Sequence, residues 1–188
     1  MRNLEIKATV VSLAACRARV RRLPGAARHA RLRQTDWYFT VPRGRMKLRE
    51  IVTGRARTAE LIVYERPDTQ SARTSRFVRL PAAECAATRR LLTAMFGVAV
   101  CVRKQREVWL YQNARIHLDR VTGLGDFVEI EVVVTEGMPQ ARRVMAMVRD
   151  ALGIESGDLV GPSYSDLLLA GASDARTRRR ETETTGSP

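Results

Sequence analysis

The chain has 188 residues, of which 45% are apolar, so it is long enough for one domain with a hydrophobic core and too short for two ordinary domains. Its formal net charge of +13 comes far more from arginine than from lysine, which favours a polyanionic partner: nucleic acid, an acidic membrane surface or a phosphorylated small molecule. Guanidinium groups bind phosphate bidentately and stay charged when desolvated, although GC-rich codon usage would also enrich arginine.

The cysteines and the apolar runs indicate where the protein resides. Cys16, Cys85 and Cys101 are odd in number and widely spaced, with no CxxC pair, which is typical of small buried side chains in a reducing compartment. No charged start precedes an apolar run of signal length, and no apolar stretch approaches the roughly 20 residues of a membrane-spanning helix. We therefore expect a cytoplasmic protein with no membrane partner.

Residues 3–8 have the alternation of a β-strand. Apolar side chains at positions 4, 6 and 8 alternate with Glu5 and Lys7, so the carboxylate and the ammonium share one face. A surface strand with its polar side in water would give the same pattern. Charged faces that recur further along the chain favour a functional site over an ordinary surface strand.

A short helix and a hairpin follow. Residues 11–23 have helical spacing, with Ser12 as the expected N-cap and Pro24 at the end. Residues 31–39 are rich in aromatic and β-branched side chains, and a turn leads from them into a strand at 45–51.

The second arm of this hairpin has the clearest charge pattern in the chain. Arg45, Lys47 and Arg49 alternate with apolar residues, so three cations share one face. Strands at 59–66 and 75–80 come next, and a helix runs from Pro81 to Gly97.

The second half repeats the strand pattern. A long strand at 98–111 carries Lys104 and Arg106 on one face. The next strand places Arg115 and Asp119 on one face, together with His117, which could shuttle a proton or act only as a neutral hydrogen-bonding residue. After a glycine-containing turn, a strand at 126–134 brings two carboxylates together, Glu129 and Glu131.

Two helices and a tail complete the chain. Residues 138–152 have the apolar spacing of a packed helix, and a short apolar helix is expected at 164–170. The sequence from 172 to 188 lacks apolar periodicity, so we predict one domain over residues 1–171 and a disordered tail over 172–188.

The strand pattern predicts an α+β fold: a closed or nearly closed antiparallel β-barrel of about eight strands, with helices packed outside. The barrel would collect the period-two charges in a lumen. Its cationic set is Lys7, Arg45, Lys47, Arg49, Lys104, Arg106 and Arg115, and its acidic set is Glu5, Asp119, Glu129 and Glu131.

These two sets of charge favour phosphoryl-transfer chemistry. Clustered cations repel one another unless a polyanion lies between them, and carboxylates face phosphates only when a divalent cation such as Mg2+ or Mn2+ intervenes. The alternative is that the charges form salt-bridge ladders on the outer face of an ordinary sheet, each worth under about 1 kcal/mol.

Five motifs together resemble the CYTH superfamily, also called triphosphate tunnel metalloenzymes, and among them the class IV adenylyl cyclase and thiamine triphosphatase type. They are NLEIKA, GRMKLRE, VYERPD, VRKQRE and RIHLDRVTGLGDFVEIE. The resemblance spans residues 2–170 and implies a tunnel-shaped barrel that holds a triphosphate and divalent ions. The chain departs from the opening Glu-x-Glu-x-Lys signature of the family at one position, where Asn3 stands in place of the first glutamate.

Carried over residue by residue, the resemblance implies specific roles. The implied metal ligands are Glu5, Asp119, Glu129 and Glu131. The implied triphosphate contacts are Lys7, Arg45, Lys47, Arg49, Arg66, Lys104, Arg106 and Arg115. The implied catalytic residues are Lys7, Lys47, Arg106 and Asp119.

The implied activity is a phosphorus–oxygen lyase of the adenylyl cyclase type, which converts ATP to cyclic AMP and pyrophosphate with Mg2+ or Mn2+. A triphosphatase acting on thiamine triphosphate, a nucleoside triphosphate or tripolyphosphate is the first alternative, and a non-catalytic nucleotide-, polyphosphate- or nucleic-acid-binding module is the second. The sequence offers neither an aromatic platform nor a reading helix, which argues against nucleic acid as the partner. A homodimer is compatible with the sequence.

Overall fold

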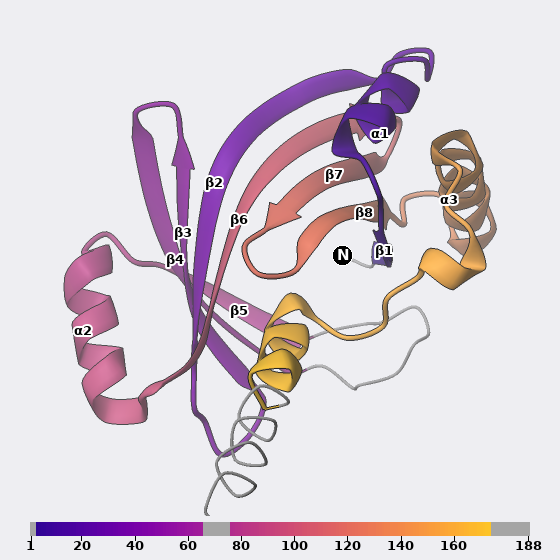
Figure 1. Ribbon diagram of the computed structural model, residues 1–188. Coiled ribbons are helices and arrows are strands. Elements are labelled where there is room, and N and C mark those ends of the chain that lie inside the picture. The colour runs from indigo at the N-terminus through magenta and orange to yellow at the C-terminus, as the bar shows by residue number, and fades with distance from the viewer. Residues whose placement is uncertain (1–2, 66–75, 174–188) are drawn as a thin grey trace, which may run out of the picture.

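Eight antiparallel strands form one sheet in the computed structural model, which describes residues 3–65 and 76–173 (Figure 1). The spatial order of the strands is β1-β8-β7-β6-β2-β3-β4-β5. Their bounds are β1 Asn3–Thr9, β2 Ala27–Phe39, β3 Arg45–Thr53, β4 Ala56–Glu65, β5 Arg76–Pro81, β6 Val98–Tyr111, β7 Ala114–Val121 and β8 Gly125–Val133. The predicted α+β class and the number of strands are confirmed.

The helices lie between and after the strands. They are α1 (Leu13–Val20), α2 (Cys85–Phe96), α3 (Met138–Leu152), the 3-10 turn η1 (Ser156–Asp158) and a final helix over residues 164–173. Ser12 caps α1 as predicted, since its Oγ accepts a hydrogen bond from the Ala15 amide at 3.3 Å. No helix among the described residues is both long and apolar enough to cross a bilayer.

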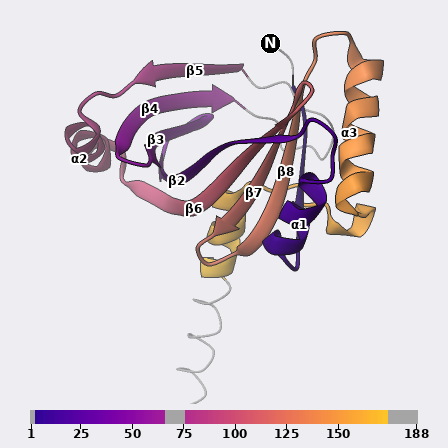
Figure 2. The same cartoon turned by 90° about the horizontal axis from the view of Figure 1, so that it is seen from above.

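The sheet curls because its two longest strands, β2 and β6, pair along their lengths and bend (Figure 2). Register shifts interrupt their pairing between Arg28 and Ala30 and between Tyr38 and Phe39. Extra residues of this kind bend a strand and increase its twist. The sheet therefore has one concave and one convex face.

The curled sheet is not closed by hydrogen bonds, so the predicted closed barrel is not confirmed. Among the described residues, the edge strands β1 and β5 do not pair with each other. The outer edge of β1 instead meets the chain after η1: the Val160 amide donates to the Lys7 carbonyl at 2.8 Å, and Ala8 bridges to Leu159. This segment therefore occupies part of the edge of β1 that a closing strand would otherwise use.

Two apolar cores cover the convex face. Helices α1 and α3 pack on β1, β8 and β7 around residues such as Ile116, Ile130 and Val148. Helix α2 packs on β2 and β3 around Leu48 and Leu92. The even-numbered residues of β3 and β8 supply these cores, which leaves their odd-numbered, charged residues on the concave face.

The final helix departs from the prediction that helices pack only outside. Its Tyr164 packs with Phe127 and Val102 on the concave side, where it covers one end of the curled sheet (Figure 1). Most of the tail expected from residue 172 lies outside the described residues.

Candidate active site

One cavity of about 450 Å³ lies on the concave face, and charged side chains dominate its lining. The charged lining residues are Glu5, Lys7, Asp36, Lys47, Arg49, Arg79, Lys104, Arg106, Glu129 and Glu131, with His117 beside them. They come from β1, β2, β3, β5, β6, β7 and β8, so the fold gathers them from the whole length of the chain.

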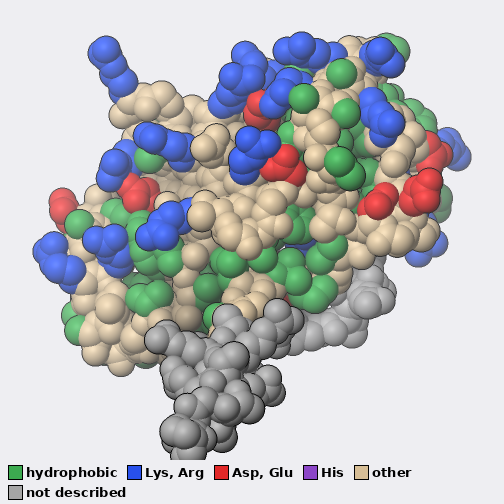
Figure 3. Space-filling view, in the orientation of Figure 1, with side chains coloured by type: hydrophobic (Ala, Val, Ile, Leu, Met, Phe, Trp, Pro, Cys, Tyr) green, Lys and Arg blue, Asp and Glu red, His purple; other side chains and the backbone are tan. Residues whose placement is uncertain are grey.

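The lysines of the chain show that this gathering is selective. The chain has only three lysines among its 33 basic residues, and all three, Lys7, Lys47 and Lys104, line this cavity. The other 30 basic residues are therefore arginines, and Figure 3 shows how widely Lys and Arg side chains spread over one face of the molecule. A compositional preference for arginine therefore explains the surface but not the cavity, where a compact ammonium is retained.

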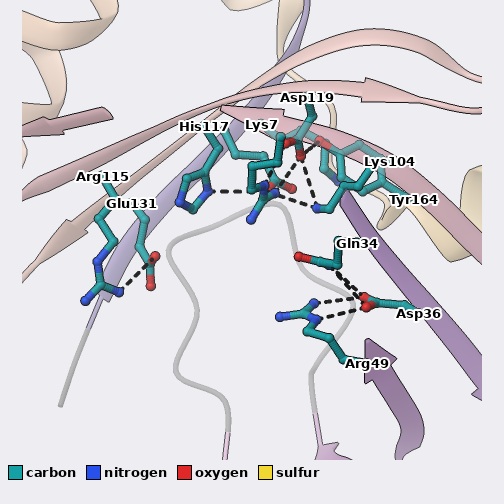
Figure 4. Close-up of polar contacts among 12 residues, drawn as sticks. Lys7, Gln34, Asp36, Arg49, Lys104, Arg115, His117, Asp119, Glu131 and Tyr164 are labelled. Atoms are coloured by element: carbon teal, nitrogen blue, oxygen red, sulfur yellow. Dashed lines mark hydrogen bonds and ion pairs between the residues drawn. The ribbon is translucent and has the colours of Figure 1, made fainter. Parts of the chain in front are cut away.

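Asp36 holds the first pair of cations. It is 3% exposed and accepts hydrogen bonds from Arg49 at 2.9 and 2.8 Å and from Lys47 at 3.0 Å. Gln34, two residues earlier on β2, donates to the same carboxylate at 3.1 and 3.2 Å (Figure 4). Asp36 and Arg49 are direct cross-strand partners, so the register of the β2–β3 hairpin builds this cluster.

Asp119 holds the second pair in the same manner. It is 0% exposed and accepts hydrogen bonds from Arg106 at 2.6 and 2.5 Å and from Lys104 at 3.1 Å. The Tyr164 hydroxyl donates to it at 3.1 Å (Figure 4). Arg106 and Asp119 are again direct cross-strand partners, here on β6 and β7.

Burial and charge set the protonation states of both clusters. Burial alone would raise the pKa of Asp36, but the charges of Lys47 and Arg49 outweigh it and hold that pKa well below its ordinary value. The pKa of Asp119 is lowered in the same way by Lys104 and Arg106. Burial lowers the pKa of both lysines, and their carboxylate partners only partly offset it.

A third group of carboxylates lies at the β1–β8 side of the cavity. Glu5 is the direct cross-strand partner of Glu131, and Glu129 is two residues along the same face. Like charges directly opposite each other destabilise a sheet, so Glu5 and Glu131 form a place where a cation would lower the energy. Glu129 is partly committed, because it accepts a hydrogen bond from Arg106 and lies 3.8 Å from His117 Nδ1.

Asn3 adds a neutral amide to this group. Its Nδ2 donates to Glu131, and its Oδ1 is the one buried side-chain oxygen or nitrogen without a hydrogen-bond partner among the described residues. No three His, Cys, Asp or Glu residues in that part of the chain lie close enough to hold an ion together. Mg2+ typically uses only one or two protein carboxylates and takes its other ligands from water and phosphate, so these donors fit that ion type.

The segment that precedes the final helix covers the cavity. The Pro162 carbonyl accepts a hydrogen bond from Lys7, and the Tyr164 ring lies 4.8 Å from the Nζ atoms of both Lys7 and Lys104. Arg45 donates to Ser163 at 3.0 Å and to Asp166 at 3.2 Å. Cations from three strands thus hold this segment in place.

Two tyrosines border the cavity at β2 and β4. Lys47 Nζ lies 5.1 Å from the ring centre of Tyr38 and 5.7 Å from that of Tyr64. Burial, together with the neighbouring Asp36 charge, raises the pKa of Tyr38 to about 12, and burial beside Tyr38 raises that of Tyr64 to about 12. Both hydroxyls are therefore protonated at neutral pH.

The cavity brings most of the predicted site residues together. Those that line it are Glu5, Lys7, Lys47, Arg49, Lys104, Arg106, Glu129 and Glu131. Asp119 lies beneath them and is enclosed by its partners. Arg45 contacts the 163–166 segment, Arg115 is 51% exposed and 3.6 Å from Glu131, and Arg66 lies outside the described residues.

Several residues that line the cavity were not predicted from the sequence. Gln34, Asp36 and Tyr38 have the same parity on β2 and so share one face, but periodicity alone does not tell that this face lines the cavity. Arg79 and Tyr64 sit on strands whose pattern is mainly apolar. Tyr164 belongs to the final helix, and no local signal tells that this helix returns to the concave face.

The fold is shared with solved structures of low sequence identity. The PH1012 protein of Pyrococcus horikoshii superposes with a TM-score of 0.75 at 22% identity, over 88% of this chain and 98% of its own. The PH1819 protein of the same organism superposes with a TM-score of 0.74 at 23% identity, over 90% of this chain and 99% of its own. A Vibrio parahaemolyticus protein provisionally assigned as an adenylate cyclase superposes with a TM-score of 0.70 at 20% identity, over 89% of this chain and 98% of its own.

A sequence-family model covers far more than half of the chain. No curated protein sequence matches significantly. The model of the CYTH domain, however, matches residues 1–161, a range that contains the eight strands of the described residues and both cation clusters. The chain therefore belongs to the CYTH domain family.

Proposed function

We propose that the protein is a divalent-metal-dependent enzyme that acts on an organic triphosphate, with ATP converted to cyclic AMP and pyrophosphate as its reaction. The observation that carries this proposal is that all three lysines line the concave cavity, next to facing carboxylates. A phosphate chain needs the cations, and the carboxylates are compatible with that chain only when a divalent ion lies between them.

Each cation cluster would bind phosphate oxygens. Lys47 and Arg49 form one unit and Lys104 and Arg106 the other, and their aspartate partners keep them oriented before the substrate arrives. Preorganised charge of this kind stabilises the charge that develops on phosphate oxygens in the transition state. Lys7, Arg45 and Arg115 would add contacts toward the ends of the triphosphate, and the family resemblance implies a substrate-binding role for Arg66 as well.

Of Glu5, Glu129 and Glu131, one or two would contact the metal ion directly and the rest through its water ligands, and the ion when bound supplies charge neutralisation of the phosphates. Asp119 is better explained as a positioning residue, because its oxygens accept hydrogen bonds from Lys104, Arg106 and Tyr164. This proposal replaces the metal contact, direct or through water, that the family resemblance implied for Asp119.

The cavity size favours an organic triphosphate over a bare phosphate chain. A volume of about 450 Å³ falls within the range that encloses drug-sized molecules. In the cyclase reaction the ribose 3'-oxygen would attack the α-phosphorus and lose its proton, and the bond from the α-phosphorus to the pyrophosphate oxygen would break. The enzyme would position the two oxygens in line.

A triphosphatase is the second candidate, and one contact favours it. Lys47 lies against the rings of Tyr38 and Tyr64, so the face of each ring that it covers is closed to a nucleobase. In that reaction a water oxygen would attack the γ-phosphorus and the diphosphate would leave. Both reactions use the same cations.

Product analysis separates the candidates. The protein is incubated with ATP, GTP, thiamine triphosphate and tripolyphosphate in Mg2+ or Mn2+, and the products are identified by mass. Cyclic nucleotide with pyrophosphate supports the cyclase, and free phosphate supports the hydrolase. Glu129→Gln should abolish turnover, whereas the exposed Glu136→Gln should not. Tight nucleotide binding with no turnover of any triphosphate would refute an enzymatic role.

A further inference from the structure

An uncovered strip crosses the convex face between its two apolar cores. It is built by the middle of β2 and β6, where Arg33, Arg103 and Gln105 are exposed. Their neighbours Gln34 and Lys104 are buried on the concave face, so the strip lies directly behind the cation clusters of the cavity. Helices α1 and α3 end on one side of the strip and α2 lies on the other.

The register aligns the basic residues of this strip. Gln105 is the cross-strand partner of Arg33 on β2 and of Arg120 on β7, so these three residues form one row across the sheet. Arg103 is two residues along β6, opposite Thr35. Three guanidiniums therefore surround one amide side chain within neighbouring strands, where like charges repel.

The carboxylates near the strip are already paired with arginines, one of which, Arg120, belongs to the strip itself. Glu107 accepts hydrogen bonds from Arg17 at 2.7 to 3.1 Å and pairs with Arg31 at 3.2 Å, and Asp126 accepts from Arg120 at 2.8 and 2.9 Å. For Arg33 and Arg103, the part of the chain that the structure describes offers no acidic partner within 4.0 Å.

Two cavities open along the strip and share residues. Their volumes are about 660 and 670 Å³, and Arg33, Gln105 and Arg120 line both. Arg103, Thr122 and Gly123 line the second, which adds hydroxyl and backbone groups beside the guanidiniums. None of the described residues that line either cavity is aromatic.

We infer that this strip is a second anion-binding site, specific for a small, multiply charged phosphate group such as pyrophosphate or a short polyphosphate. Guanidiniums without acidic partners offer paired donors that match phosphate oxygens, and a bound anion removes their mutual repulsion. Single-stranded nucleic acid is a poorer fit, because sites for it combine basic grooves with aromatic side chains that stack on the bases. The inference does not rest on the proposed function, although Arg106 also lines the first of these cavities and Lys104 the second.

Pyrophosphate titration of the full chain without metal, followed by amide NMR, tests the inference. The amides of residues 122–125 should shift with saturation, and Arg33→Gln with Arg103→Gln should weaken this response about tenfold or more through loss of charge-assisted hydrogen bonds. The control Arg28→Gln with Arg90→Gln removes the same charge from exposed positions outside both cavities and should leave the affinity nearly unchanged.

Binding in the concave cavity is distinguished with Lys47→Ala, which should leave the shifts of residues 122–125 intact. The inference is overturned if these amides do not shift, if Arg33→Gln with Arg103→Gln responds like the control, or if Lys47→Ala removes the response. A single-stranded oligonucleotide that saturates the same amides at lower concentration than pyrophosphate would also overturn it.

Discussion

Asp36 on β2 lies directly opposite Arg49 on β3, and its carboxylate accepts two hydrogen bonds from that guanidinium, at 2.9 and 2.8 Å. Asp119 on β7 stands in the same relationship to Arg106 on β6. In both cases a lysine two residues before the arginine joins the cluster. Along the neighbouring strands β7, β6, β2 and β3, an aspartate therefore alternates with a Lys-x-Arg pair. This order spreads the positive charge across the cavity wall while each of these four cations has a carboxylate partner.

Asp36→Asn should lower the free energy of unfolding by about 3–5 kcal/mol, because Lys47 and Arg49 would remain buried without a counter-charge. Urea denaturation at neutral pH measures the loss. The folded pKa of Asp36 is depressed, so the carboxylate stabilises the protein above its unfolded pKa, and this contribution declines as pH falls. The difference between wild type and variant should therefore shrink in acid.

Asp126→Asn is a matched control for that measurement. Asp126 also accepts two hydrogen bonds from one guanidinium, that of Arg120, at 2.8 and 2.9 Å, but Arg120 is 65% exposed. Exposed ion pairs contribute little because water screens them. If both variants lose the same free energy of unfolding, burial is not the reason that the Asp36 carboxylate stabilises the protein.

Strand parity predicted much of the site, because alternation alone places Glu5 with Lys7 and Lys104 with Arg106 on single faces. It did not identify Asp36, since a lone acid in an aromatic strand gains meaning only when the hairpin register sets Arg49 opposite it. Register depends on turn geometry and long-range packing, which local periodicity does not report.

Closure of the sheet is the other point where the sequence was insufficient. Eight strands with charged inner faces suggested a barrel, yet the edge of β1 bonds to residues near Val160. That segment reads as a loop followed by an apolar helix, and the contact between Lys7 and Pro162 joins positions far apart in the chain. Such non-local contacts have no period or spacing from which to be predicted.

Tyr164→Phe should reduce the free energy of unfolding by about 1–3 kcal/mol, because the buried Asp119 carboxylate loses one donor while the ring stays over Lys7 and Lys104. Tyr164→Ala should cost more, since the edge-to-face contact with Phe127 at 5.0 Å is also lost. Thermal and urea unfolding of both variants measure the difference.

Tyr111→Phe serves as the comparison for Tyr164→Phe. Tyr111 is also buried, but its hydroxyl only accepts a hydrogen bond, from the exposed Gln112 side chain at 3.1 Å. Removal of the Tyr111 hydroxyl takes no hydrogen-bond donor from a buried charge, so the free energy of unfolding should fall less than in Tyr164→Phe. A larger loss for Tyr111→Phe would contradict the role assigned to the Tyr164 hydroxyl.

The affinity for tripolyphosphate without metal should fall as pH rises, and the fall should begin below pH 10.5, the ordinary pKa of lysine. Burial lowers the folded pKa of Lys47 and Lys104, so both ammonium charges are lost as pH rises through those depressed values. Calorimetry between neutral pH and pH 10.5 should show falling affinity with proton uptake on binding. In Lys47→Arg with Lys104→Arg the decline should flatten, and an unchanged decline would exclude these lysines as its source.

Asn3→Glu should destabilise the metal-free protein and increase the rise in melting temperature that Mn2+ produces. Asn3 Nδ2 now donates to Glu131, whereas a glutamate would repel it and would add a charged oxygen ligand for a hard cation. Melting with and without Mn2+, and calorimetric titration of the ion, measure both effects. Gln112→Glu adds the same charge at an exposed turn and should change neither. If Asn3→Glu leaves the Mn2+-dependent shift unchanged, position 3 does not contact the ion.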